Sequence, residues 1–275
     1  MARAIWSGAI SFGLVSVPVK AFSASKDHSV HFHQVQKGTG SRINYKKVAE
    51  KSGREVKSDD IEMGYELSKG NVVTVDPDEI EALRPQSTKA IDVTDFVPLD
   101  DIDPVYFEKT YWLAPDGDTA TRAYRLLLEA MEAEGRVGIG TVVMRRKQYL
   151  ACIRPLDGAL AMSTMRFADE VIDKSEIDAI PSRRSTPDKK ELALAHQIID
   201  ALASEFDPKK YKDTYTAELR KIIKQRSEGK EVKVEAPPAV DENVLDLMAA
   251  LEASVDAAKQ ARTSRTSKPR RRKSA

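Results

Sequence analysis

The chain has 275 residues, and its 44 lysines and arginines nearly balance its 43 aspartates and glutamates, so the formal net charge is only +1. With 41% hydrophobic residues it can bury a substantial core, which excludes wholesale disorder. Its single cysteine excludes an internal disulfide and a multi-thiolate metal site. The sequence has neither a run of about 18 apolar residues nor a signal-peptide pattern, so we expect a soluble protein of the cytoplasm.

Charge is distributed unevenly along the chain. Residues 35–58 contain seven basic and two acidic residues, whereas residues 59–118 contain four basic and sixteen acidic residues. Residues 262–275 contain seven basic residues and no acidic residue. The near-neutral total is therefore an average over opposed blocks, and it does not exclude an anionic partner.

Strand patterns dominate the first two thirds of the chain. Alternation and β-branched side chains predict a strand over residues 11–19, in which Pro18 marks an edge or the end of pairing. Further strands are predicted over residues 71–75, 90–97, 105–113, 137–145, 149–154 and 159–167. So many strands with few helices between them favour a β-rich, mixed fold with an antiparallel sheet closed into a barrel or sandwich.

Two helices are predicted within this β-rich body. Asp76 followed by Pro77, with Glu79 three residues after Asp76, is a capping-box start for a short helix that ends near residue 84. Residues 119–134 place apolar side chains on one helical stripe, and Gly135 is the expected stop.

The sequence pattern changes after residue 180, where the predicted body of residues 1–180 ends. Residues 187–228 are predicted to form two amphipathic helices, the second of which opens at Asp207 and Pro208. Residues 229–240 are interpreted as a linker and residues 241–260 as a third amphipathic helical segment. Residues 261–275 are predicted to be a disordered basic tail.

No group of residues predicts catalysis or a metal site. His28, His31 and His33 lie close together, but no thiolate is near them, and ordinary exposed histidines on a strand are the favoured interpretation. Gly138 and Gly140 lack the lysine of a phosphate-binding loop and are interpreted as part of a strand. Cys152 is interpreted as a small core residue. We expect no enzyme activity, no cofactor and no bound metal.

Clustered lysines and arginines indicate an anionic ligand. A nucleic-acid backbone binds clustered positive charge and releases counterions without its sequence being read. Two such clusters occur, one within residues 37–57 and one within residues 262–273. The alternative interpretation of the first cluster is a solvated loop, and that of the second is a tail that only aids solubility. The candidate DNA-binding residues are Lys37, Arg42, Lys46, Lys47, Lys51, Arg54 and Lys57, and in the tail Arg262, Arg265, Lys268, Arg270, Arg271, Arg272 and Lys273. Residues 145–147, also basic, are interpreted as a hairpin turn, and a contribution to the same surface is left open.

Several specific blocks occur in a characteristic order along the chain. They are RAIWSGAISFGLV at residues 3–15, VPVK at 17–20, FHQ at 32–34, RINYKK at 42–47, GYE at 64–66, IDPVYF at 102–107, FDP at 206–208 and YKDTY at 211–215. In this order they resemble bacterial Ku, the DNA end-binding family of non-homologous end joining. The resemblance covers almost the whole chain.

The resemblance implies a Ku-like β-barrel core with a bridging arm over about residues 30–66. Two copies are expected to form a homodimeric ring around a double-stranded DNA end, with the basic cluster in the encircling arm and the acidic stretch facing outward. No catalytic residue is implied. Some relatives carry a Cys-x-x-Cys pair at the positions of Ala49 and Ser52, so this chain supports no metal or redox role there.

The resemblance also implies that a C-terminal helical region recruits and stimulates the multidomain ATP-dependent DNA ligase of the pathway. The candidate ligase-binding residues are Leu192, Ile199, Tyr211, Tyr215 and Leu219, for which packing of the two helices against each other is the alternative. We thus expect a nucleoid-associated protein that binds and protects double-strand breaks. The rival functions are a nucleoid-type architectural protein that binds DNA or RNA mainly through its basic tail, and a metal-dependent nuclease that uses the acidic block.

Overall fold

The computed structural model describes residues 2–83, 89–181, 188–230 and 254–255. The chain divides into two compact units, Met1–Glu176 and Ile177–Ala275. Almost all of the predicted linker and third helical segment, and the whole of the predicted tail, lie outside the described residues.

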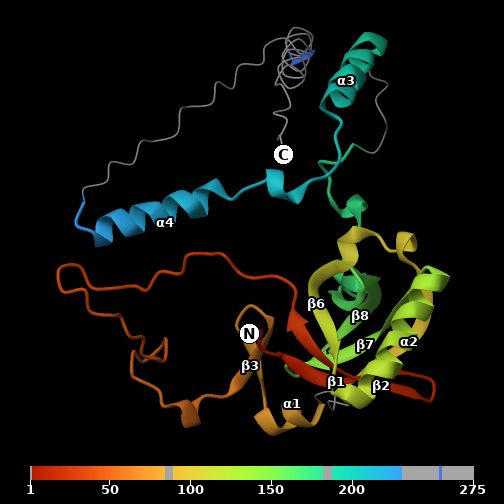
Figure 1. Cartoon of the computed structure of the whole chain (residues 1–275). Helices are drawn as coiled ribbons and strands as arrows, with labels where there is room; N and C mark the ends of the chain where they lie inside the picture. Colours follow the sequence, from red (N-terminus) through yellow and green to blue (C-terminus); the bar gives the residue numbers. More distant parts are fainter. Residues whose placement is uncertain (1, 84–88, 182–187, 231–253, 256–275) are drawn as a thin grey trace. The chain divides into compact units, whose positions relative to one another are not determined.

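Seven strands of the first unit close into a barrel (Figure 1). In the order in which they pair, they are β1 (Trp6–Phe12), β2 (Val15–Ser23), β6 (Phe107–Pro115), β9 (Ala159–Met165), β8 (Lys147–Leu156), β7 (Arg136–Met144) and β5 (Ala90–Pro98). All neighbours are antiparallel except β5 and β1, whose parallel pairing closes the barrel. The predicted closed β-architecture is confirmed.

Two glycines allow the strands next to β5 to approach it closely. A Cβ atom at Gly8 would lie 2.1 Å from the carbonyl oxygen of Lys89, which accepts a hydrogen bond of 2.8 Å from the amide of Ala9. On the other side of β5, a Cβ atom at Gly140 would lie 2.0 Å from the carbonyl oxygen of Asp92. Gly140 therefore belongs to a strand, as predicted, and its lack of a side chain serves barrel packing.

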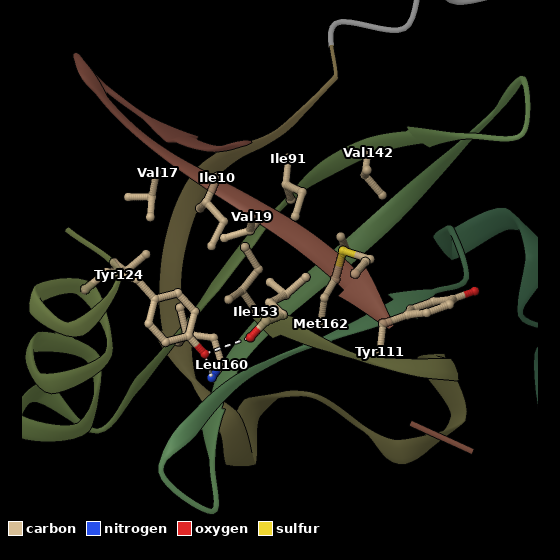
Figure 2. Close-up of a cluster of buried hydrophobic side chains, with 14 of the residues drawn as sticks. Ile10, Val17, Val19, Ile91, Tyr111, Tyr124, Val142, Ile153, Leu160 and Met162 are labelled. Atoms are coloured by element: carbon tan, nitrogen blue, oxygen red, sulfur yellow. Dashed lines mark hydrogen bonds between the residues drawn. The ribbon is translucent and has the colours of Figure 1, made fainter. Parts of the chain in front are cut away.

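The barrel core is completed by α2 (Asp118–Glu134), which ends at Gly135 in the left-handed conformation with φ at 61°. Leu127 and Met131 from this helix join the inward side chains of the strands. Tyr124 of the same helix does so too, as Figure 2 shows. The Tyr124 hydroxyl donates a hydrogen bond of 2.8 Å to the carbonyl oxygen of Leu113 and accepts one of 2.7 Å from the amide of Leu160. One buried hydroxyl thus links the helix to both β6 and β9.

β8 and β9 are also buried on the face that points away from this core. Cys152 and Met165 form a second apolar cluster there with Val137. Tyr106 and Phe107, where the chain enters β6, pack against the cluster from outside. Burial on both faces explains why β9 reads as a nearly continuous run of apolar and small residues instead of alternating.

Smaller elements of the first unit connect these strands. A separate hairpin consists of β3 (Met63–Ser68) and β4 (Asn71–Val75), and α1 (Pro77–Leu83) follows it. The amide of Asp76 donates to the Glu79 carboxylate at 3.3 Å, and the amide of Asp78 donates to the Asp76 carboxylate at 2.8 Å, which confirms the predicted helix start. The short 3-10 turns are η1 (Ser58–Asp60), η2 (Leu99–Asp101), η3 (Pro104–Tyr106), η4 (Ala168–Glu170) and η5 (Lys174–Glu176).

The predicted single strand over residues 11–19 is wrong. The chain turns at Gly13, whose φ is 58°, and separates β1 from β2. The alternation of apolar residues continues through this turn, so it carries no sign of the reversal. Pro18 lies opposite Ala9 of β1, one residue before the pairing of β2 with β6 begins at Val19, so it does mark an end of pairing.

In the second unit, α3 (Lys189–Leu202) begins after Asp188, whose carboxylate accepts a hydrogen bond of 2.7 Å from the amide of Lys190. The prediction that the next helix opens at Asp207 is wrong. Asp207 caps only the short turn η6 (Pro208–Lys210), and α4 (Thr214–Ser227) begins after Asp213, whose carboxylate accepts from the amide of Thr216 at 2.9 Å. Hydrogen bonds from the side chain and then the amide of Thr216 lower the pKa of Asp213. No helix in the described part of the chain is long and apolar enough to cross a bilayer.

Candidate nucleic-acid interface

The basic cluster lies on a long connection between β2 and β3, residues 24–62, which we call the arm (Figure 1). All residues of the arm are described, and apart from η1 it contains no helix and no strand, only two isolated β-bridges. The strand expected to carry His31 and His33 does not form. No side chain of the arm is buried. The cluster is thus carried by a segment that projects its side chains into solvent.

Two tight loops organise the arm, residues 34–43 (loop A) and residues 47–56 (loop B). Loop A is closed by a hydrogen bond of 3.1 Å from the amide of Ile43 to the carbonyl oxygen of Gln34. Loop B is closed by one of 2.9 Å from the amide of Val56 to the carbonyl oxygen of Lys47. Backbone bonds within each loop therefore replace the sheet pairing that the arm lacks.

The seven predicted cations of the arm are all exposed. Among the described residues only Lys46 has a carboxylate partner, Glu55, at 2.8 Å. The other six, Lys37, Arg42, Lys47, Lys51, Arg54 and Lys57, make no ion pair within the described part of the chain. Their charge is not neutralised within the chain, as an electrostatic interface with a polyanion requires.

Two aromatic residues of the arm were not among the predicted site residues. Phe32 and Tyr45 are 68% and 79% exposed. Both line a hollow of about 350 Å³, together with His33, Gln34, Arg42 and Ile43. The Tyr45 hydroxyl is hydrogen-bonded to the side-chain oxygen of Gln34. The signal available in the sequence was the presence of large aromatic residues beside the basic cluster.

The second basic group, Arg145 to Lys147, forms the turn between β7 and β8, as predicted. Arg145 and Arg146 have φ values of 51° and 67°. Arg146 lies 3.4 Å from the Glu81 carboxylate, and Lys147 lies 3.8 Å from that of Glu170. Because two of its three charges are paired inside the first unit, this turn offers less to an external anion than the arm does.

The histidines of the arm and Cys152 show no arrangement for metal or nucleophilic chemistry. Within the described residues no three His, Cys, Asp or Glu side chains are arranged as metal ligands. His31 lies 3.5 Å from Asp27, whose pKa is lowered by hydrogen bonds from Ser29. Cys152 is fully buried, and burial raises the pKa of its thiol to about 11. This thiol is protonated at neutral pH and acts as a core residue, as predicted.

The five candidate ligase-binding residues lie in the second unit. Leu192 and Ile199 of α3 are exposed, as are Tyr211 and Tyr215, and Leu219 of α4 is half-buried. Neither helix contains a buried residue, and the alternative in which these side chains pack the two helices against each other stays a prediction. Tyr211 lies between η6 and α4 and stacks on Phe206, with ring centroids 6.1 Å apart. These apolar side chains are accessible to a partner.

The seven predicted cations of the tail, from Arg262 to Lys273, lie outside the described residues.

Comparison with known proteins gives a consistent result. The family model described as the Ku70/Ku80 beta-barrel domain matches residues 11–194. The chain is 44% identical over 262 residues to non-homologous end joining protein Ku 1 of Saccharopolyspora erythraea, covering 95% of this chain and 81% of the relative. It is 40% identical over 261 residues to the Ku protein of Anaeromyxobacter sp. (strain K), covering 94% and 87%, and 37% identical over 256 residues to that of Bacillus subtilis, covering 92% and 81%.

Proposed function

The chain belongs to the Ku family, and from that premise we propose that it binds the ends of double-stranded DNA in non-homologous end joining, without regard to base sequence. The observation that supports this most strongly is the arm, where six exposed cations have no acidic partner among the described residues. Phosphates neutralised by these side chains release counterions irrespective of the bases between them. We propose the same role for the tail cations Arg262 to Lys273.

We further propose that two copies form a ring around the DNA end. The β3–β4 hairpin supports a second copy, because Met63, Tyr65 and Leu67 on it are each at least 60% exposed. An isolated two-stranded hairpin is marginal in water, so apolar residues on it need a covering surface. A closed ring converts modest phosphate attraction into long residence, since DNA escapes only through an end.

For the second unit we propose recruitment of an ATP-dependent DNA ligase. The exposed Leu192 and Ile199 on α3, with the stacked Phe206 and Tyr211, are apolar groups that the described part of the unit leaves uncovered. Exposed aromatic and aliphatic side chains of this kind anchor protein interfaces. We also propose that the ring protects the DNA end, because it occupies the duplex there.

The decisive experiment compares binding of the full chain to linear duplex and to covalently closed circles of matched length and sequence. We expect binding to the linear duplex, at a level that falls with salt, and little retention on circles. Equal affinity for both would contradict the ring. A variant that lacks residues 262–275 separates the rival function, since an architectural protein that acts through its tail loses binding, whereas the ring keeps its preference for ends.

The ligase assignment has its own test. We expect the double variant Leu192→Ser/Ile199→Ser to bind ends like the unmodified protein but to stimulate ligation less, because the substituted side chains are exposed and not part of a core. Lys189→Gln, at the start of the same helix, is the matched control. Loss of end binding together with folding in the double variant would show that these side chains are structural and would refute the assignment.

A further inference from the structure

Loops A and B of the arm share one pattern of hydrogen bonds, displaced by thirteen residues. They differ at Gly38, whose φ of 90° is not repeated at its counterpart Lys51. Loop A has four such bonds. The amide of Gln36 donates to the carbonyl oxygen of Ser41 at 2.8 Å, and the amide of Gly40 donates to that of Gln36 at 3.0 Å. The amide of Ile43 donates to the carbonyl oxygen of Gln34 at 3.1 Å, and the amide of Ser41 donates to Thr39 Oγ1 at 3.3 Å. In loop B the amide of Ala49 donates to the carbonyl oxygen of Arg54 at 2.9 Å, and the amide of Gly53 donates to that of Ala49 at 2.8 Å. The amide of Val56 donates to the carbonyl oxygen of Lys47 at 2.9 Å, and the amide of Arg54 donates to Ser52 Oγ at 3.4 Å. Each of the four bonds of loop A therefore recurs in loop B.

Two further features repeat at the same displacement. The isolated bridge between Val35 and Arg42 has its counterpart between Val48 and Glu55. Gly40 and Gly53 follow the hydroxyl residues and have φ values of 69° and 63°, which only glycine adopts without strain. The side chains are mostly different, so the repeat is carried by the backbone, the glycines and the two hydroxyls.

The tips of both loops expose backbone donors. The amides of residues 37–39 and of residues 50–52 donate to no acceptor within the described part of the chain. A Cβ atom placed on Gly38, Gly40 or Gly53 would meet nothing within 4 Å, so the tips face open space. Successive free amides in a turn with a left-handed residue form a concave site for an anion.

Each tip also carries one lysine without a carboxylate partner among the described residues, Lys37 in loop A and Lys51 in loop B. The lysines are one position apart when the loops are superposed by sequence, because Lys51 corresponds to Gly38. A long, flexible side chain tolerates this difference when its ligand is a phosphate oxygen, since lysine binds phosphate as a point charge.

We propose that loops A and B are a duplicated phosphate-binding unit, in which the free amides and the lysine of each tip bind one phosphate of the DNA backbone. Thr39 and Ser52 are positioning residues, because each hydroxyl accepts the amide that follows the glycine and holds the tip in shape. The inference rests on the proposed function and adds to it two equivalent phosphate sites in each copy of the chain.

The test measures how the affinity of the full chain for a linear duplex depends on salt between about 50 and 200 mM. Lys37→Gln and Lys51→Gln should each make the slope of log affinity against log salt less negative by about 0.9 for every phosphate that is no longer neutralised, hence about 1.8 in a dimer. The double variant should show the sum. Lys69→Gln, in the turn between β3 and β4, is the matched control and should leave the slope unchanged.

Several outcomes would overturn the duplication while leaving end binding intact. Unchanged slopes in both variants, with the preference for linear over circular DNA retained, would show that the tips do not contact phosphate. A change in only one variant would show that the loops are not equivalent. A change in dimer mass, measured by light scattering, would assign the tips to contact between copies. Failure of the unmodified protein to prefer ends would instead contradict the proposed function.

The positioning role of the Thr39 and Ser52 hydroxyls is tested by comparing, at each position, a variant that removes the hydroxyl with one that keeps it. Thr39→Val and Ser52→Ala should weaken binding by about two- to tenfold, the equivalent of one modest hydrogen bond, whereas Thr39→Ser and Ser52→Thr should bind like the unmodified protein. Rescue by the residue that keeps the hydroxyl distinguishes positioning from a general effect of substitution. Equal binding by the valine and serine variants of Thr39 would refute the positioning role.

Discussion

The barrel and the arm of the first unit are stabilised in opposite ways. In the barrel, β8 and β9 are buried on both faces, and β5 lies so close to its neighbours β1 and β7 that a methyl group at Gly8 or Gly140 would collide with backbone. In the arm no side chain is buried, and three glycines of the loops face open space. One region is determined by long-range packing and the other by local hydrogen bonds.

This difference separates folding from binding. Interiors at the density of the barrel respond to single methyl groups, so its residues have little freedom to serve a ligand. The arm has no core to disturb, so its charges and free amides can be exposed toward an anion. We expect substitutions in the barrel to change the free energy of unfolding, and substitutions in the arm to change DNA binding with little effect on unfolding.

The largest contrast is expected between two glycines. Gly8→Ala places a methyl group against the carbonyl oxygen of Lys89, where β1 and β5 close the barrel, and should lower the free energy of unfolding by roughly 3 kcal/mol. Gly38→Ala in loop A meets no atom but strains a residue with φ at 90°, at a cost of about 1 kcal/mol. Urea unfolding monitored by circular dichroism measures both, and an unchanged midpoint for Gly8→Ala would contradict the closure of the barrel at this pair of strands.

Large apolar side chains should show the same contrast. Leu160→Ala opens a cavity at a residue that is fully buried in the barrel core and should cost about 2–5 kcal/mol. Ile43→Ala also shortens a large apolar side chain, but Ile43 lies in the arm and is 44% exposed. We therefore expect its free energy of unfolding to change by no more than about 0.5 kcal/mol. Comparable losses in the two variants, measured by the same unfolding curves, would show that the arm folds with the barrel.

Two tyrosine hydroxyls sharpen the comparison further. Tyr124→Phe leaves the buried amide of Leu160 without this acceptor and should cost about 1–3 kcal/mol. Tyr45→Phe removes a hydroxyl that bonds to Gln34 in the exposed arm, where water takes its place, and should leave the unfolding midpoint nearly unchanged. The reverse order of the two effects would contradict the assignment of Tyr124 as the link between α2 and the strands.

The last expected effect concerns the barrel alone and is a dependence of its stability on alkaline pH. Burial raises the pKa of Cys152 from 9.0 to about 11, so the folded state keeps a proton that the unfolded state releases in this range. The contribution of this thiol is therefore complete below about pH 9 and is lost as the pH rises toward 11. Cys152→Ala should flatten the fall of the unfolding free energy over this window. The same slope in both proteins would exclude the thiol as its cause.

Local patterns predicted much of the barrel. The strands from residue 71 onward and α2 with its stop at Gly135 were found because period, capping and glycine signals are local. The turn at Gly13 was missed because apolar residues alternate through it without interruption. The start of α4 was misplaced because Asp207 and Asp213 both carry a capping signal, and only the structure shows that the first caps a single turn.

For the interface, the sequence by itself determined where the positive charge lies, since a cluster of cations is visible in composition alone. It also identified the family through the order of its motifs. Only the tertiary structure decided which cations are paired, because Lys46 meets Glu55, and Arg146 meets Glu81, across distances that no local pattern encodes. The closure of the barrel between Gly8 and Lys89 and the duplication of the loops likewise depend on backbone hydrogen bonds. The sequence shows the glycines and hydroxyls at these places but not the bonds that the backbone makes there.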